Sequence, residues 1–187
     1  MNGDDQRLIA DCLKGRTAAF GELVRRYQDR LYNTVYRLVG SAEDAQDVVQ
    51  EAFLHAYQSL DRFKGDSRFF TWLYRIAVNS AISLKRKQRV VVSIRLGREG
   101  QGGPAEPLDN SEFSQPGRPL ERAEEERRIQ LALSRMSPEH RAVLILKDME
   151  EQKYEDMAEI LQVPIGTIRS RLHRARLELR TLLERSE

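Results

Sequence analysis

The sequence predicts an all-α protein of two small helical domains joined by a flexible linker. Apolar residues recur at steps of three and four along most of the chain, which is the pattern of amphipathic helices. Residues 90–119 are instead rich in glycine, proline and polar residues, with too few apolar ones to offset the entropy of folding. Residues 120–187 end in a helix, a short turn and a longer basic helix, the pattern of a helix-turn-helix. The expected boundaries are therefore 1–89, 90–119 and 120–187.

The first domain is expected to begin with two helices. Asp4 or Asp5 can cap a short helix that ends at Gly15, because carboxylates accept free backbone N–H groups and glycine tolerates the left-handed conformation of a helix end. Thr17 is the expected N-cap of a longer helix that ends at Gly40. The apolar face of this long helix needs partners, and the following helices supply them.

A third helix is expected from about Ala42 to Leu60. Ser41 and Asp44 fit a capping box, in which a hydroxyl and a carboxylate bind backbone N–H groups of the first turn. Five side chains of this helix fall away from its apolar face: Asp44, Asp47, Gln50, Glu51 and Leu54. A solvated surface is the ordinary explanation for such a face.

The stretch from Arg62 to Arg89 combines eight basic residues with aromatic rings and contains only one acid, Asp66. It overlaps the loop sequence DRFKGDSR, residues 61–68, which leads into a helix. Cations that contact phosphates and rings that stack on unpaired bases are what a single-stranded nucleic-acid groove needs. The alternative is that the rings belong to the core, and helical spacing favours it for Phe69, Trp72, Leu73, Ile76 and Leu84. Contact is expected instead for residues beside this stripe, Phe70, Thr71, Tyr74, Arg75 and Asn79.

Order is expected to end near Val90, where residues 90–93 could form a short strand before the linker.

In the second domain, Ser137 is the expected N-cap of a helix with Pro138 at its first position. On the last helix the apolar residues share one arc. That arc leaves Thr167, Ser170 and Arg174 on the opposite side and Arg169, Arg171 and His173 on the flanks. Such groups contact base edges and phosphates in a major groove, and the alternative is a basic surface helix with no partner.

Composition excludes several kinds of site. Cys12 is the only cysteine, so no intrachain disulfide or cysteine zinc cluster can form, and it is expected to be a small core residue. No secretory signal or long apolar run is seen, which predicts a cytoplasmic protein. His55, His140 and His173 have no metal-ligand spacing. An enzyme acting on nucleic acid is therefore disfavoured, and neither a cofactor nor a small-molecule substrate is expected.

Two strings resemble a known family. DVVQEAFLHAYQSLDRFKGDSRFFTWLYRIAVN, residues 47–79, resembles region 2 of bacterial sigma factors of the extracytoplasmic-function (ECF) group. PIGTIRSRLHRAR, residues 164–176, resembles their region 4. The resemblance implies a transcription initiation factor that binds core RNA polymerase, recognises minus-10 and minus-35 promoter elements and assists promoter melting. It also implies an inhibitory anti-sigma factor, which could hold the chain at the membrane.

The resemblance implies three sets of contacts. Core polymerase is expected to bind Asp47, Gln50, Glu51 and Leu54. Single-stranded minus-10 DNA is expected to bind Phe63, Lys64, Ser67, Phe70, Thr71, Trp72, Tyr74, Arg75 and Asn79. Duplex minus-35 DNA is expected to bind Thr167, Arg169, Ser170, Arg171, His173 and Arg174.

The chain departs from the family near its helix-turn-helix. Lys153 stands where many relatives have a Ser or Thr N-cap, and Glu151 and Gln162 stand where glycine is frequent, which predicts less relaxed turns. His173 occupies a position where relatives vary. The alternative function is a stand-alone helix-turn-helix regulator that binds duplex DNA without polymerase. Such a regulator needs neither a polymerase-binding helix nor a single-strand groove.

Overall fold

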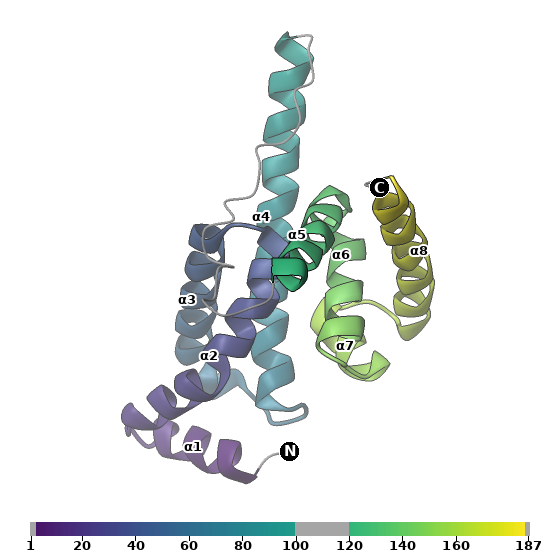
Figure 1. Ribbon diagram of the computed structural model, residues 1–187. Coiled ribbons are helices and arrows are strands. Elements are labelled where there is room, and N and C mark those ends of the chain that lie inside the picture. Colours follow the sequence, from purple (N-terminus) through teal and green to yellow (C-terminus); the bar gives the residue numbers. More distant parts are fainter. Residues whose placement is uncertain (1–2, 100–119, 186–187) are drawn as a thin grey trace.

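The computed structural model describes the backbone of residues 3–99 and 120–185 and the side chains of residues 3–91 and 124–185. The described residues form helices and no strand (Figure 1), which confirms the all-α prediction. The N-terminal body contains α1 (Gly3–Leu13), α2 (Ala18–Val39), α3 (Ala42–Gln58), a 3₁₀ turn η1 (Leu60–Arg62) and α4 (Phe69–Glu99). The C-terminal body contains α5 (Leu120–Arg135), α6 (Pro138–Leu144), a π-helical turn η2 (Ile145–Met149), α7 (Tyr154–Leu161) and α8 (Ile165–Glu184).

Local signals placed several helix ends correctly. The Ser41 hydroxyl accepts the Asp44 backbone N–H at 3.2 Å, and the Ser137 hydroxyl accepts that of His140 at 3.2 Å. Gly40 ends α2 with a φ of +75°, a conformation that glycine adopts without steric cost. Among the described residues the Asp44 carboxylate accepts no bond from the Ser41 backbone N–H, as a full capping box would require, and instead accepts one from Gln88 on α4 at 3.1 Å.

The predicted side-chain caps of the first two helices do not form, although Thr17 does occupy the N-cap position of α2. Thr17 has helical backbone angles and makes no side-chain cap. Because α1 already begins at Gly3, Asp5 lies inside its first turn, where it is 4% exposed. Its carboxylate accepts hydrogen bonds from the Tyr27 hydroxyl, at 2.6 Å, and from Arg26. Asp5 therefore joins α1 to α2, and burial together with this acid raises the pKa of Tyr27 to about 12.

Helix α4 is longer than predicted. It continues to Glu99, so the prediction of a short strand at 90–93 is wrong. The β-branched run Val90–Val92 suggested a strand, but adding residues to an existing helix is far easier than starting a new element. The remainder of the predicted linker, 100–119, lies outside the described residues.

The N-terminal body forms around α2, α3 and α4, which pack on one another. Leu23, Leu31, Ala45 and Leu73 are fully buried at its centre. Cys12 is also buried, as predicted, and burial raises the pKa of its thiol. Among residues 3–99 and 120–185, no helix combines the length and the apolar character needed to cross a membrane.

The C-terminal body packs directly on the N-terminal one. Helices α6 and α7 lie against α4, and α5 lies against α2 (Figure 1). The Arg141 side chain, in α6, is buried between the two bodies and donates hydrogen bonds to the carbonyl oxygens of Leu38 and Ser134. The sequence made no prediction about this arrangement. It determines which of the expected contact residues reach the surface.

The two positions at which the family resemblance leads us to expect glycine adopt the conformation that glycine favours. Glu151 and Gln162 both have a φ of +53°. Gln162 ends α7, and its backbone N–H donates to the Ala158 carbonyl. A residue with a Cβ is strained in this left-handed region by about 1 to 2 kcal/mol. The expectation of less relaxed turns at these positions is therefore confirmed by the backbone geometry.

Gln162→Gly is expected to raise the free energy of unfolding by about 0.5 to 1 kcal/mol, because strain relief exceeds the extra entropy of glycine in the unfolded chain. The measurement is the urea midpoint by circular dichroism. Gln46→Gly is the matched control, since Gln46 is exposed inside α3. It should lower the free energy of unfolding by about 1 kcal/mol. Destabilisation by both changes would contradict the assignment of strain to Gln162.

Candidate nucleic-acid interface

The loop between η1 and α4 forms one wall of a cavity of about 250 Å³. Gly65 has a φ of +77°, which lets the loop turn back toward α4. Three cations, two aromatic rings, two carboxylates, a hydroxyl and a glycine line the cavity: Arg62, Phe63, Lys64, Gly65, Asp66, Ser67, Trp72, Arg75 and Glu159. Most of these residues come from the stretch expected to bind single-stranded DNA. Glu159 comes from α7 of the C-terminal body.

Aromatic rings support the floor of this cavity. The Phe63 and Trp72 ring centroids are 5.2 Å apart, and Phe63 meets Phe69 edge-on at 5.9 Å. Trp72 is 8% exposed, so only part of its ring reaches the cavity. The core interpretation is confirmed for Phe69, Trp72 and Leu73. Ile76 and Leu84 are half-buried and pack against the core.

Three residues expected beside the apolar stripe are buried, which corrects the predicted exposure of Phe70, Thr71 and Tyr74. The Phe70 and Tyr74 ring centroids lie 3.9 Å apart, and the Arg30 guanidinium stands 4.6 Å from the Phe70 centroid. Burial raises the pKa of Tyr74. These rings lie between α2 and the turn before α7, and this neighbour from the second body was not visible in the helical spacing.

The polar candidates on α4 are half-buried and face α7. Asn79 donates from its side-chain amide to the Ile160 carbonyl at 2.9 Å and to the Arg75 carbonyl at 2.7 Å. The Arg75 guanidinium lies 3.9 Å from the Glu159 carboxylate. Lys64 is exposed and Ser67 is half-buried. The loop side of the candidate site is thus open, and the α4 side is occupied by α7.

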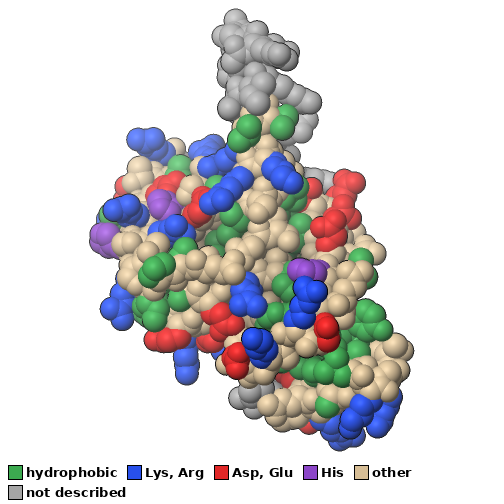
Figure 2. All heavy atoms as spheres, turned by 180° about the vertical axis from the view of Figure 1, so that it is seen from behind, with side chains coloured by type: hydrophobic (Ala, Val, Ile, Leu, Met, Phe, Trp, Pro, Cys, Tyr) green, Lys and Arg blue, Asp and Glu red, His purple; other side chains and the backbone are tan. Residues whose placement is uncertain are grey.

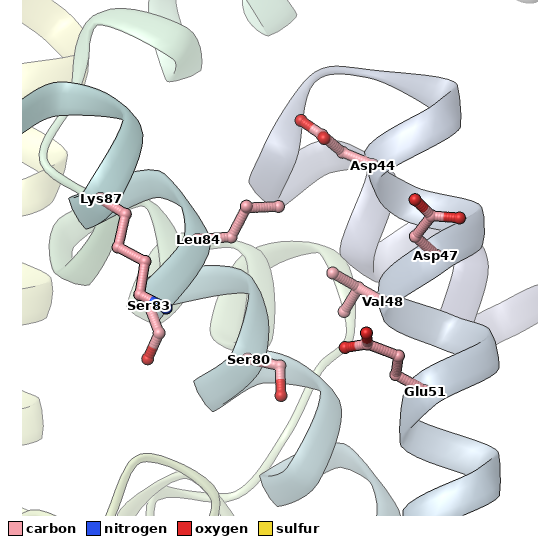
Figure 3. A pocket seen from close by; sticks show the side chains of 8 residues that line it. All are labelled: Asp44, Asp47, Val48, Glu51, Ser80, Ser83, Leu84 and Lys87. Atoms are coloured by element: carbon pink, nitrogen blue, oxygen red, sulfur yellow. The ribbon is translucent and has the colours of Figure 1, made fainter. Parts of the chain in front are cut away.

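The candidate polymerase-binding residues on α3 share one open surface. Asp47, Gln50, Glu51 and Leu54 are all exposed, and Leu54 is 55% exposed although it is apolar. A groove of about 340 Å³ lies beside them between α3 and α4. Figure 3 shows Asp44, Asp47, Val48 and Glu51 of α3 facing Ser80, Ser83, Leu84 and Lys87 of α4. Carboxylates beside exposed apolar surface suit a partner with basic and apolar side chains.

The helix-turn-helix consists of α7, the turn 162–164 and α8. Ile168, Leu172 and Ala175 face the core, as the spacing predicted. Of the six candidates for duplex contact, Arg169, Ser170, His173 and Arg174 are exposed, while Thr167 and Arg171 are half-buried. Arg174 forms no ion pair with any residue in the described part of the chain. Figure 2 shows basic and histidine side chains along the edge of the molecule where α8 runs.

The sequence interpretation missed the acidic residues that contact the N-terminal body. Asp156 accepts a hydrogen bond from Arg68 at 2.6 Å, and the Thr71 hydroxyl lies 3.4 Å from the same carboxylate. Glu150 accepts hydrogen bonds from Arg30 at 2.7 Å and from Thr34 at 2.8 Å. A signal was present, because YEDMAEIL is acidic while α4 is basic. Charge alone gave no indication that these two segments meet.

Comparison with protein families gives two matches. Residues 23–90 match the family described as Sigma-70 region 2, and residues 126–179 match the one described as Sigma-70, region 4. The chain is 37% identical over 178 residues to the RNA polymerase sigma-H factor of Pseudomonas aeruginosa. It is 40% identical over 179 residues to the ECF RNA polymerase sigma-E factor of Escherichia coli. Each alignment covers 92% of this chain and 90% of the relative.

Two solved structures are also similar. One is CnrH in complex with the cytosolic domain of CnrY, with a TM-score of 0.71, 26% identity and coverage of 98% of this chain and 99% of the other. The second is the sigma factor RpoE in complex with the anti-sigma factor NepR from Bartonella quintana. Its TM-score is 0.66 at 27% identity, and the match covers 88% of this chain and 96% of the other.

Proposed function

This chain belongs to the ECF group of the sigma-70 family, and we propose that it directs core RNA polymerase to promoters through three surfaces. It is an initiation factor and not an enzyme, so polymerase performs the chemistry. The observation that carries the proposal is that regions 2 and 4 occur in one chain, aligned with sigma factors over nearly its full length. A stand-alone helix-turn-helix regulator does not need region 2.

The first surface is the exposed face of α3, where Asp47, Gln50, Glu51 and Leu54 bind core polymerase. The second is the cavity between the 61–68 loop and α4, where a melted minus-10 base is held. Extruding a base costs less from a melted strand than from a duplex, so such a cavity favours the open promoter. Of the residues expected to bind this base, Lys64 is exposed at the cavity, and Phe63 and Ser67 are half-buried there. Phe70, Thr71, Trp72, Tyr74, Arg75 and Asn79 support it or become accessible when α7 moves away.

The third surface is the outward face of α8, which enters the major groove of the minus-35 element. The exposed Ser170 and Arg174 lie within three turns of its N-terminus. This surface also includes Thr167, Arg169, Arg171 and His173. The N-terminal body thus holds single-stranded DNA at the minus-10 element, and the C-terminal body holds duplex DNA at the minus-35 element. Domain limits near 89 and 120 remain part of this proposal, although α4 itself continues to Glu99.

An anti-sigma factor is the proposed inhibitory partner, because the RpoE structure contains one. It would cover polymerase-binding surfaces and release the chain on a signal. The site of action is the cytoplasm, where core polymerase lies. Holding the chain at the membrane would then depend on that partner.

The test is run-off transcription with purified core RNA polymerase on a library of genomic fragments. Promoter-specific transcripts that require this chain would support the proposal. Their absence, together with binding of duplex DNA by the chain alone, would favour the stand-alone regulator.

Arg174→Ala is expected to lower the transcript yield from a selected promoter about tenfold, because losing one base or phosphate contact costs about 1 to 3 kcal/mol. Affinity for core polymerase should stay unchanged. The matched control is Arg180→Ala, since Arg180 is an exposed arginine of α8 that pairs with Glu184 at 2.9 Å. Equal yields from the two variants would remove Arg174 from the promoter-binding surface.

A further inference from the structure

One candidate for duplex contact, Arg169, lies against an aromatic ring that belongs to another helix. Arg169 is exposed in the second turn of α8, and it forms no ion pair with the described part of the chain. Its guanidinium carbon lies 5.7 Å from the ring centroid of Tyr154, the first residue of α7. A cation at this distance is attracted by the negative charge of the ring face. The contact therefore joins the two helices of the helix-turn-helix.

A second cation stands at the same ring. The Lys147 ammonium lies 5.0 Å from the Tyr154 centroid and donates a hydrogen bond to the Gln152 carbonyl at 3.0 Å. Lys147 belongs to η2, and π-helical turns are rare and frequently occur at functional sites. The neighbouring Asp148 accepts two hydrogen bonds from Arg176 of α8, at 2.5 and 3.1 Å. These contacts fix the place of the ring relative to both η2 and α8.

Tyr154 has the character of a fixed platform. Its side chain is half-buried and packs against the hydrophobic core, so the ring has little freedom left to lose when DNA binds. A free arginine side chain, by contrast, loses considerable rotamer freedom when it is immobilised. Holding that side chain in advance lowers the cost of binding. In the part of the chain that the structure describes, no ring contact holds Arg174 in this way.

From these contacts we propose that Tyr154 is a positioning residue for minus-35 recognition. Its ring holds the Arg169 guanidinium in one orientation, so that the cation meets the duplex already placed for contact. The ring acts through the arginine, and the tyrosine hydroxyl is not required. This inference rests on the proposed minus-35 role of α8.

The order of the Arg169 side chain can be measured in the free, full-length chain. The proton–nitrogen heteronuclear NOE of an arginine Nε–H group reports motion on the ps–ns timescale. Arg169→Lys and Arg174→Lys assign the two signals. The Arg169 group should be ordered in the wild type and in Tyr154→Phe, and as mobile as that of Arg174 in Tyr154→Leu. Equal mobility of the two groups in the wild type would overturn the proposal, and that comparison needs no change at Tyr154.

Run-off transcription with core polymerase, at a concentration that does not saturate the promoter, measures the consequence for recognition. Tyr154→Leu should lower the transcript yield about two- to fivefold, because an exposed cation–π contact is lost. Tyr154→Phe keeps the ring and should keep the wild-type yield. Arg169→Ala should lower the yield about tenfold. Adding Tyr154→Leu to Arg169→Ala should cause no further loss, because residues that act through one contact are not additive.

Other results would overturn the proposal. Additive losses would mean that the tyrosine supports the fold or contacts DNA by itself, and an equal loss in Tyr154→Phe would mean that the hydroxyl is the active group. An unchanged yield from Arg169→Ala would leave no contact to position. Failure of the proposed function would look different, because the wild-type chain would then give no promoter-specific transcripts with core polymerase, while the order of Arg169 in the free chain can still be measured.

Discussion

Arg141→Ala is expected to lower the free energy of unfolding by about 3 to 5 kcal/mol, the largest stability effect of any single change considered. Arg141 lies in α6 and is 2% exposed. It donates to the carbonyl oxygen of Leu38, in the last turn of α2, and to that of Ser134 at 2.7 Å. The end of a helix carries partial negative charge, so a guanidinium is well placed there.

The cost of the alanine has two parts. Both carbonyl oxygens would lose a donor inside the protein, and each unsatisfied group costs about 1 to 3 kcal/mol. The missing side chain would also leave a cavity. Burial lowers the pKa of Arg141 to about 10, with the nearby Arg89 contributing in the same direction, so the group remains a cation at neutral pH. The lowered pKa means that burying this charge opposes folding at every pH below about 10, and the carbonyl hydrogen bonds offset that cost.

Chemical unfolding followed by circular dichroism measures this effect. Arg176→Ala is the control, because Arg176 is about half exposed and its pair with Asp148 lies at the surface. Its effect should stay within about 1 kcal/mol, as for other surface ion pairs. A similar denaturation midpoint for the two variants would show that the Arg141 contacts contribute no more than a surface pair.

Features governed by neighbours in sequence were predictable. Ser41, Ser137 and Gly40 marked helix ends because capping depends on a residue and the turn beside it. The outward face of α8 followed from spacing, since one long apolar arc fixes which side packs inward. The strained turn at Gln162 was expected only from the family resemblance, because glutamine itself gives no signal of a left-handed conformation.

Features governed by the packing of distant segments were not predictable. The spacing of α4 defined one apolar stripe but not that a second body covers its flank, so Phe70 and Tyr74 were expected at the surface. Asp5 suggested a cap, although its partners Arg26 and Tyr27 lie one helix away. Glu150 forms its buried contacts 116 and 120 positions from its partners in sequence. No periodicity encodes such a contact.

Asp47→Arg combined with Glu51→Arg is expected to weaken binding to core polymerase about hundredfold, because opposed like charges at an interface cost several kcal/mol. Both acids are exposed on α3 beside the groove shown in Figure 3. Neither has an ion pair within the described residues, so the fold should be unaffected. The affinity can be measured by fluorescence anisotropy with a labelled chain. Asp29→Arg, an exposed acid on α2, is the control for a change in charge alone.

Transcription by the same double variant separates the polymerase surface from the DNA surfaces. The candidate DNA contacts on α4 and α8 are unchanged in it, so a large excess of core polymerase should restore the transcript yield. The same excess should not rescue Arg174→Ala, because that variant is expected to bind core polymerase normally and to lack only a promoter contact. If the double variant binds core polymerase as tightly as Asp29→Arg does, α3 is not the polymerase-binding helix. If excess polymerase fails to restore its transcripts, the two acids act at a step after binding.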